Sequence, residues 1–391
     1  MSGHHLVGQE EMEAISKIFT EQGGVLFAHG FDQRRNNIFN VKRVEEQLAH
    51  SVFHCDHVSL VSSGTAALKI ALLGLGVKRG DTVITQAFNF VAVAEVLHDL
   101  GVKICFVDSD ETLNMCPKQL AVALRKTDNV GAVIPVSMLG VLPKIREISS
   151  ICSKNNVPLI LDACESLGTT IDGKDPTRFC DASVYSFDFG KTITCGEGGA
   201  ISTNNQNLKT FCESYRDHGH SFTVDKRNLD PANFPGFNYR ITEMQAAVLG
   251  AQIQKLPKII ALQNDRYNAF YSNFGLNIGA FLRKIPIKTK CQNDNIFLVG
   301  LKKNEIEFAI KEMQSLQIGT KNVPDALLWH LSYHWEHIIT GVKQCEVSTR
   351  MNKVLSRSIA INVDVSREVS VYAKLGEILG KRLGNDNRES L

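Results

Sequence analysis

No Cys-x-x-Cys pair occurs in this sequence, although it contains ten cysteines among 391 residues. All of them stand singly, and several lie in apolar, strand-like runs such as "VKICFVD", where a free thiol behaves as a small hydrophobe. Zinc sites and disulfide frameworks use paired or regularly spaced cysteines, so this pattern argues against both. We therefore expect no metal site, and we expect a reducing compartment, the cytoplasm.

An excess of one charge and a long apolar run are also missing. The net charge is +2, which offers no basic surface suited to coating nucleic acid. The longest apolar runs, such as "AALKIALLGLGV", are too short or too interrupted to span a bilayer. The first residues, "MSGHHLVGQEEMEAISKIF", lack a basic segment followed by an apolar core, so we expect no signal peptide. Nucleic acid and membrane are therefore not expected partners.

Apolar β-rich runs alternate with helical runs through much of the chain. The runs "TVITQA", "KICFVD" and "VPLILDACES" are mostly apolar throughout, which is typical of strands covered by helices on both faces of a sheet. This alternation predicts a three-layer α/β/α domain with a mostly parallel sheet. Two further runs, "ASVYSFDF" and "GGAIST", are joined by a loop without room for a helix, so this pair is predicted to be antiparallel.

The chain is long enough to divide into two domains. A long helical run, "RITEMQAAVLGAQIQKLPKIIALQNDRYNAFYSNF", is predicted to bridge them. We predict a large domain over residues 1–258, which includes the N-terminal segment, and a smaller α+β domain over residues 259–391.

Lys191 lies between a strand-like run and a glycine-rich stretch, in "SFDFGKTITCGEGGAIST" (residues 186–203). A solvated loop lysine is the simplest interpretation. Gly190, Lys191 and Thr192 also match the end of the phosphate-binding P-loop pattern, but that pattern needs a glycine where the chain has Tyr185. The third interpretation is a lysine that forms a Schiff base with a carbonyl compound, and the rest of the chain has to decide it.

Polar groups follow two of the predicted strands. Ser62, Ser63, Gly64 and Thr65 lie between a strand and a helix, where free N–H groups and hydroxyls suit a phosphate. Simple capping of the helix explains the same residues. Asp162 ends a buried strand at the edge of the sheet where α/β proteins bind ligands. It is either a carboxylate with a cationic partner or an ordinary strand-end cap.

Two more groups complete the pattern around Lys191. Ser186 offers a hydroxyl, and "FNYR" (residues 237–240) offers an amide, a phenol and a guanidinium, or else a helix start on the surface. A phosphorylated, cationic, aldehyde-bearing cofactor would use all of these groups, and pyridoxal phosphate has those three properties. Its phosphate would meet the Gly64–Thr65 helix start, its protonated pyridine nitrogen would meet Asp162, and its aldehyde would condense with Lys191.

The stretches that carry Gly64, Asp162, Ser186, Lys191 and "FNYR" follow one another in an order that resembles the DegT/DnrJ/StrS-type sugar aminotransferases. These are a branch of the fold type I enzymes that depend on pyridoxal phosphate (PLP). The resemblance extends over residues 58–256 and is weak in the C-terminal third. The fold it implies is that of a fold type I PLP-dependent transferase. The matching motifs are "SSGTAAL", "FNFVAVAEVL", "FVDSDETLNM", "LDACESLGT", "SFDFGKTITCGEGGAI", "RDHGH" and "GFNYRITEMQAAVLG".

The resemblance implies a role for each matching residue. Lys191 corresponds to the Schiff-base lysine and Asp162 to the partner of the pyridine nitrogen, and Gly64, Thr65 and Ser186 correspond to phosphate ligands.

The resemblance also implies roles for residues farther from the lysine. Phe90 lies where the family stacks an aromatic ring on the cofactor, unless it is a core residue, and Glu165 lies where many members have a glutamine facing the cofactor's phenolic oxygen. Asn238 matches a residue that reaches the phosphate of the neighbouring subunit, which implies a homodimer with shared active sites. His218 and Arg240 match positions near the pocket, where structural duty is an equal alternative.

The function implied is an aminotransferase with a ping-pong cycle. An amino-acid donor, with glutamate expected, would leave its nitrogen on the cofactor, and a keto-sugar would take it up in cell-surface polysaccharide or lipopolysaccharide biosynthesis. A keto-sugar dehydratase of the same family is the alternative among enzymes, but those proteins carry histidine where this chain has Lys191. A non-catalytic regulator that binds PLP is the alternative outside enzymes.

The acceptor is expected to be a nucleotide-linked keto-sugar or an acidic ulosonate. Arg34 and Arg35 follow the first helix in a segment that departs from the family pattern, and a solvated loop is one interpretation of them. The motif "WHLSYHWEH" is a second departure, and a small-domain core is one interpretation of its aromatic residues. If both line the pocket instead, they suit a carboxylate or phosphate on the acceptor. The aromatic residues in question are Trp329, His330, His334, Trp335 and His337.

Overall fold

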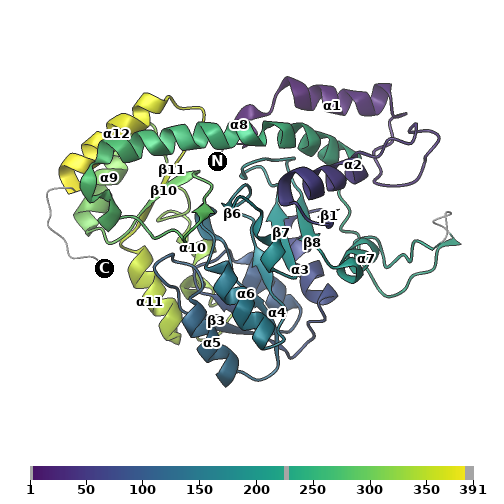
Figure 1. Ribbon diagram of the computed structural model, residues 1–391, viewed down its shortest axis with the longest axis horizontal. Coiled ribbons are helices and arrows are strands. Elements are labelled where there is room, and N and C mark those ends of the chain that lie inside the picture. Colours follow the sequence, from purple (N-terminus) through teal and green to yellow (C-terminus); the bar gives the residue numbers. More distant parts are fainter. Residues whose placement is uncertain (1–2, 224–228, 384–391) are drawn as a thin grey trace.

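The computed structural model describes residues 3–223 and 229–383, and its centre is a sheet covered by helices (Figure 1). Hydrogen bonds order the strands as β1-β8-β7-β5 and as β3-β2-β4. Parallel bridges from Val133 to Leu159 and from Val136 to Asp162 join the two parts, so the order becomes β1-β8-β7-β5-β4-β2-β3. The strands are β1 (His57–Val61), β2 (Thr82–Gln86), β3 (Lys103–Val107), β4 (Val130–Ile134), β5 (Ile160–Asp162), β7 (Ala182–Ser186) and β8 (Gly199–Thr203).

Strand β8 runs against its neighbours in this sheet. It pairs antiparallel with both β1 and β7, whereas β5 with β7, β2 with β3 and β2 with β4 form parallel pairs. The loop of residues 187–198, which carries Lys191, turns back from β7 to β8 without a helix. The predicted antiparallel pair is therefore confirmed.

Successive strand residues enter opposite hydrophobic layers, as the alternating geometry of a strand requires. In β7, Val184 packs into the layer that contains α3, α4 and α7, and Tyr185 packs into the layer that contains α2, α5, α6 and the first part of α8. Because both faces are covered, the strands are apolar throughout, and the predicted three-layer α/β/α arrangement is confirmed. These helices are α2 (Asn40–Gln47), α3 (Gly64–Gly74), α4 (Ala92–Asp99), α5 (Pro117–Lys126), α6 (Ile145–Lys154), α7 (Gln206–Tyr215) and α8 (Glu243–Phe274).

Helix α8 connects the sheet to a second hydrophobic core, and it crosses the upper part of Figure 1. Helix α1 (Gln9–Thr20) packs along it near the sheet, and α12 (Val369–Leu383) packs along its far part. The second core also contains α9 (Lys303–Ser315) and the antiparallel pair β10 (Asn295–Leu298) and β11 (Ile359–Asn362). Since α8 is continuous through residue 258, the predicted boundary lies inside a helix, and the division into domains stays a prediction. Even α8 is not apolar enough to cross a membrane, and neither is any other helix in the described part of the chain.

Part of the predicted small domain packs on the large one. Helix α10 (Leu327–His330) leads into a segment beside the loop after β2, where Phe88 and Leu331 form an antiparallel bridge. Helix α11 (Glu346–Leu355) packs against β3. A short antiparallel pair, β6 (Thr170–Ile171) and β9 (Thr289–Lys290), makes a further link across the two parts of the chain. Segments from both predicted domains therefore contact one another where the two hydrophobic cores adjoin.

Candidate active site

A cavity of about 320 Å³ opens at the edge of the sheet where the parallel strands end. The segments that follow β1, β2, β4, β5 and β7 supply one wall, because the carboxyl ends of parallel strands meet at one edge of a sheet. Residues close to β10 and β11 supply the other wall. The lining residues include Gly64, Thr65, Phe90, Met138, Asp162, Cys164, Glu165, Ser186, Asp188, Lys191, Asp294, Lys321 and Asn322.

The N-terminus of α3 forms one end of the cavity. The hydroxyl of Ser63 accepts a hydrogen bond from the N–H of Ala66 at 3.1 Å, so the capping interpretation of this serine is confirmed. Gly64 faces Ser186 so closely that a Cβ at position 64 would lie 2.9 Å from the Cβ of Ser186. Only glycine fits this approach, which leaves the first N–H groups of the helix beside the cavity and suited to an anion.

Asp162 lies at the end of β5, and 6% of it is exposed. Its carboxylate accepts a hydrogen bond from the N–H of Cys164 at 3.1 Å. Burial raises the pKa of Asp162 above its ordinary value, against this hydrogen bond and the attraction of Lys191. A cation placed in the cavity would therefore stabilise the ionised form of this buried carboxyl group.

Lys191 lies in the loop between β7 and β8 and reaches the middle of the same cavity. Its side chain is 23% exposed, and its Nζ lies 3.9 Å from an oxygen of Asp188. Burial lowers the pKa of Lys191, but the negative groups around it, with Glu165 first, raise the pKa above its ordinary value. The loop is itself ordered by Asp188, which accepts hydrogen bonds from the N–H of Gly190 at 2.6 Å and from the hydroxyl of Ser186 at 3.3 Å.

Glu165 is an ionised carboxylate with defined partners. It accepts hydrogen bonds from the N–H of Leu139 at 3.0 Å and from the side-chain amide of Asn322 at 2.9 Å. The Nε2 atom of His330 lies 3.7 Å from it. Burial raises the pKa of Glu165, but His330 and Lys191 outweigh burial and hold that pKa well below its usual range.

Phe90 lines the cavity from the loop after β2 and remains 41% exposed. Its ring centroid lies 5.2 Å from that of His330. A half-exposed aromatic ring on a cavity wall is available to stack on a planar ligand, and the alternative that Phe90 is a core residue is excluded by its exposure.

Two predicted substrate contacts are wrong because their side chains are in the protein interior. Arg35 is 0% exposed, pairs with Glu243 at 2.9 Å and donates to the carbonyl oxygens of Phe27 and Ile38, so it anchors the N-terminal segment to α8. Trp335 is 0% exposed and packs with Val91. A side chain without exposed surface cannot meet a substrate.

The other predicted substrate residues do not line this cavity either. Arg34 is exposed and donates to the carbonyl of Gly23 at 3.1 Å. Arg240 forms an ion pair with Asp217 in a separate cavity, and His218 is exposed on the loop before it. His330 is the member of the aromatic motif that approaches the cavity, through Glu165 and Phe90.

The rest of the aromatic motif lies elsewhere. Trp329 is 56% exposed, His334 packs edge-on against Tyr333, and His337 is exposed. The motif is therefore spread over a surface and a core and does not form a single wall of the cavity.

The cavity also contains residues that the sequence did not indicate. Asp188 lies inside the motif of Lys191, and its position between Ser186 and Lys191 was a usable signal. Asp294, Lys321 and Asn322 lie more than a hundred positions beyond Lys191, in a region without a recognisable motif. They reach the cavity only when the chain folds around the pair of β10 and β11.

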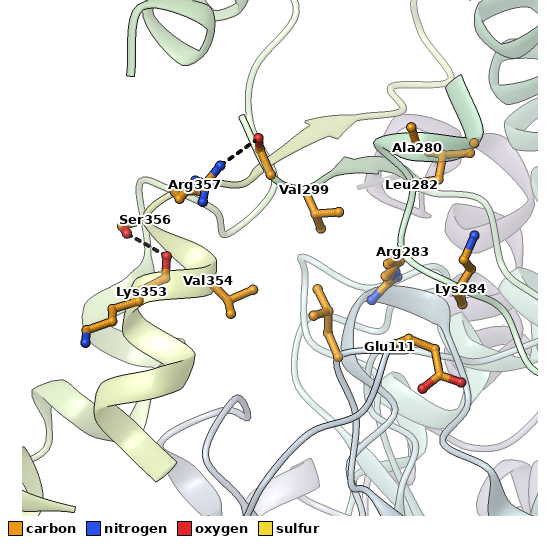
Figure 2. Close-up of a pocket in the computed structure, with 13 residues that line it drawn as sticks. Glu111, Ala280, Leu282, Arg283, Lys284, Val299, Lys353, Val354, Ser356 and Arg357 are labelled. Carbon is orange, nitrogen blue, oxygen red and sulfur yellow. Dashed lines mark hydrogen bonds between the residues drawn. The ribbon is translucent and has the colours of Figure 1, made fainter. Parts of the chain in front are cut away.

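A larger cavity, of about 680 Å³, lies between the end of α11 and the chain before β10 (Figure 2). Figure 2 shows Arg357 on one side of it and Arg283 with Glu111 on the other. Arg283 donates to the carbonyl of Met138 at 2.8 Å, Arg357 donates to the carbonyl of Gly300 at 3.2 Å, and Glu111 pairs with a lysine outside the cavity. These groups are engaged in structural contacts, so the chemistry points to the smaller cavity around Lys191.

A sequence model of the DegT/DnrJ/EryC1/StrS aminotransferase family matches residues 34–364. The UDP-2-acetamido-2-deoxy-3-oxo-D-glucuronate aminotransferase of Pseudomonas aeruginosa is 35% identical over 57% of this chain and 60% of its own length. The UDP-4-amino-4,6-dideoxy-N-acetyl-beta-L-altrosamine transaminase of Campylobacter jejuni is 31% identical over 68% of this chain and 67% of its own length. The chain thus aligns with about 60% of the first relative and about two thirds of the second.

Solved structures share the fold at lower identity. A 3-amino-5-hydroxybenzoic acid synthase superposes with a TM-score of 0.81 at 21% identity, over 96% of this chain and 97% of that one. An aminotransferase from Psychrobacter cryohalolentis superposes with a TM-score of 0.82 at 20% identity, over 97% of this chain and 98% of that one. The family match spans the strands and the loops that carry Lys191 and Asp162, and on this ground the chain belongs to the DegT/DnrJ/EryC1/StrS aminotransferase family.

Proposed function

We propose that this protein is a PLP-dependent aminotransferase that moves an amino group from an amino acid, with glutamate expected, to a keto-sugar. The observation that carries the proposal is that the Lys191 amine, the buried Asp162 carboxylate and the N-terminus of α3 share one cavity. We place the reaction in cell-surface polysaccharide or lipopolysaccharide biosynthesis. Singly scattered cysteines fit the cytoplasm as its place.

The residues of the cavity fit PLP group by group. The N–H groups at the start of α3 and the hydroxyl of Ser186 suit a phosphate dianion. Asp162 suits the protonated pyridine nitrogen, because a cation there would offset the burial that now raises the pKa of the carboxyl. Lys191 is the amine that would hold the aldehyde carbon, and Phe90 is placed to stack on the ring.

The chemistry divides between the cofactor and the chain. Bound PLP supplies an electron sink that stabilises negative charge on the substrate carbon. Asp162 would hold a proton on the ring nitrogen, and the Nζ atom of Lys191 would move protons between the cofactor and the substrate carbons, accepting one from the α-carbon of the donor and giving one to the acceptor. Donor and acceptor enter the same cavity in turn, as a ping-pong cycle requires.

The acceptor is proposed to be a nucleotide-linked keto-sugar. The names of both relatives above specify UDP-linked sugars. The case for an acidic ulosonate relied on arginines and histidines in the pocket. Arg35 is buried elsewhere, Arg34 lies outside the cavity lining, and His330 approaches the cavity only behind Glu165 and Phe90.

This function can be tested by measuring the transfer of labelled nitrogen from the donor to the sugar. Purified protein with PLP, nitrogen-15 glutamate and a UDP-linked keto-hexosamine should yield an amino-sugar that carries the label, as read by mass spectrometry. Loss of water from the sugar without transfer of nitrogen would instead identify a dehydratase. Bound PLP with no reaction on any acceptor in a panel that includes an oxidised ulosonate would favour a regulator.

The proposal includes a homodimer in which Asn238 completes the phosphate site of the neighbouring subunit. Asn238 is exposed, does not line the cavity of its own chain, and is held against Asp217 by an antiparallel bridge. Beside it, Phe237 is 51% exposed, which suits a surface covered by a second copy. An exposed asparagine beside an exposed phenylalanine is available to a partner chain.

Subunit mixing tests this arrangement. Lys191→Ala and Asn238→Asp are each expected to be inactive or strongly impaired, the second because a carboxylate would repel the phosphate. A heterodimer of the two contains one intact site, so it should recover about half of the wild-type activity per dimer. The measurement is turnover after exchange of differently tagged subunits. Heterodimers purified by both tags that stay inactive would show that the sites are not shared.

A further inference from the structure

Two lysines, Lys191 and Lys321, line the cavity. Lys321 comes from the small domain; its side chain is 7% exposed and its ammonium contacts the carboxylate of Asp294. Its backbone N–H donates to the carbonyl of Ala360 at 2.8 Å, which fixes the loop against β11. The second lysine therefore has a defined place on the small-domain wall of the site.

Asp294 holds this ammonium in position. Its carboxylate also accepts hydrogen bonds from the side-chain amides of Asn295 at 2.8 Å and Gln292 at 3.3 Å. An ammonium has three N–H donors, and the described residues place no second acceptor within hydrogen-bond distance of the Nζ atom of Lys321. Lys321 therefore keeps donors for a ligand.

Burial lowers the pKa of Lys321 to about 7, with repulsion from Lys191 adding to it and attraction from Glu165 opposing it. Because the Asp294 carboxylate contacts Nζ directly, the ammonium is the form that this pair favours. A second carboxylate entering the cavity would stabilise the charged form further.

The other groups considered for an anionic ligand are already engaged, assigned to the cofactor or outside the cavity. Glu165 is held by Leu139 and Asn322, and Lys191 is the residue assigned to the cofactor. Arg240 lies in another cavity with Asp217. Among the described residues that line the site, Lys321 is the cation left to meet an anionic group of a substrate.

We infer that Lys321 binds the α-carboxylate of the amino-acid donor, with Asp294 positioning its ammonium. The inference rests on the proposed aminotransferase function, since every α-amino-acid donor carries a carboxylate on the carbon that gives up nitrogen. Holding that carboxylate from the small-domain wall orients the carbon toward Lys191 on the opposite strand-end wall, which is how positioning lowers a barrier.

Equilibrium binding of maleate, an unreactive dicarboxylate, to the PLP-loaded protein tests the inference by isothermal titration calorimetry. Loss of a charge-assisted hydrogen bond in Lys321→Met should weaken binding roughly 10- to 100-fold. Lys321→Arg should keep most of the affinity because it keeps the charge. Lys144→Met, which changes a lysine paired with Glu111 outside the site, should leave the affinity unchanged.

A second variant guards against misfolding. Lys321→Met leaves Asp294 as an unpaired buried carboxylate, whereas Lys321→Met/Asp294→Asn removes both charges and should fold. The double variant should also bind maleate weakly, and it should raise the KM for glutamate more than it lowers kcat.

Unchanged maleate affinity in the folded double variant would overturn the role of Lys321 and leave the aminotransferase function standing. A wild-type protein that transfers no nitrogen would overturn the proposed function instead. If the variants without the Lys321 ammonium still lost maleate binding in that case, Lys321 would remain identified as a carboxylate-binding residue.

Discussion

Lys191→Ala is expected to lower the turnover number by about 10⁴-fold or more, because it removes both the group that holds the cofactor aldehyde and the group that moves the substrate proton. The protein should still fold and bind PLP, since α3, Ser186 and Asp162 remain in place. Borohydride treatment of the loaded wild type should attach the cofactor permanently to the Lys191 peptide. Single-turnover kinetics and peptide mass spectrometry measure these two outcomes.

A matched control is available in Lys144→Ala. The side chain of Lys144 is 28% exposed, close to the 23% of Lys191, but it pairs with Asp110 and Glu111 outside the cavity. This variant should keep wild-type turnover and permanent labelling at Lys191. Labelling of another lysine in Lys191→Ala, with activity retained, would contradict the assignment, and Lys321 would be the first residue to examine.

Asp162→Asn is expected to lower kcat about 10²-fold, because a buried charge pair worth about 3 kcal/mol no longer holds the ring nitrogen protonated. In the protein without PLP, the same substitution should not lower the stability of the folded state. Burial raises the pKa of Asp162 in the folded state, so its ionised form destabilises that state at pH values above the folded pKa. Without PLP the variant should therefore melt no lower than wild type, and with PLP it should gain less in Tm.

Asp175 provides the control for this change. It is 5% exposed, and burial raises its pKa to about 6, but it accepts hydrogen bonds from Tyr185 and Thr177 on the other side of the sheet. Asp175→Asn should alter Tm without altering kcat or the gain in Tm from PLP. An Asp162→Asn enzyme within a factor of about ten of wild-type kcat would show that another residue faces the ring nitrogen.

Local features of the sequence were enough to predict one wall of the site. A glycine and hydroxyls before a helix, an aspartate at the end of an apolar strand and a lysine in the turn after another strand each carry their own signal. The parallel topology then brings them together, because strands that run the same way end at the same edge. The antiparallel pair of β7 and β8 was also readable, since no helix fits between them.

Predictions that depended on burial were the ones that went wrong. Arg35 and Trp335 were candidates for the pocket because of their chemistry, with a solvated loop and a small-domain core as the alternatives, yet Arg35 is satisfied by Glu243 and backbone carbonyls, and Trp335 fills an apolar gap. A side chain's chemistry states what it can bind, but its neighbours in space decide what it does bind. Of those neighbours, Glu243 in α8 is far from Arg35 in the sequence, and Val91 after β2 is far from Trp335.

The sequence by itself determined the layer structure, the family and the strand-end wall of the cavity, because periodicity and short motifs are local properties of a chain. The tertiary structure alone decided the opposite wall. Lys321, Asn322 and Asp294 reach the site only when β10 and β11 pair and pack beside α8, and no local pattern encodes that contact. Long-range packing places a second lysine in the cavity, and with it the group that we infer binds the donor.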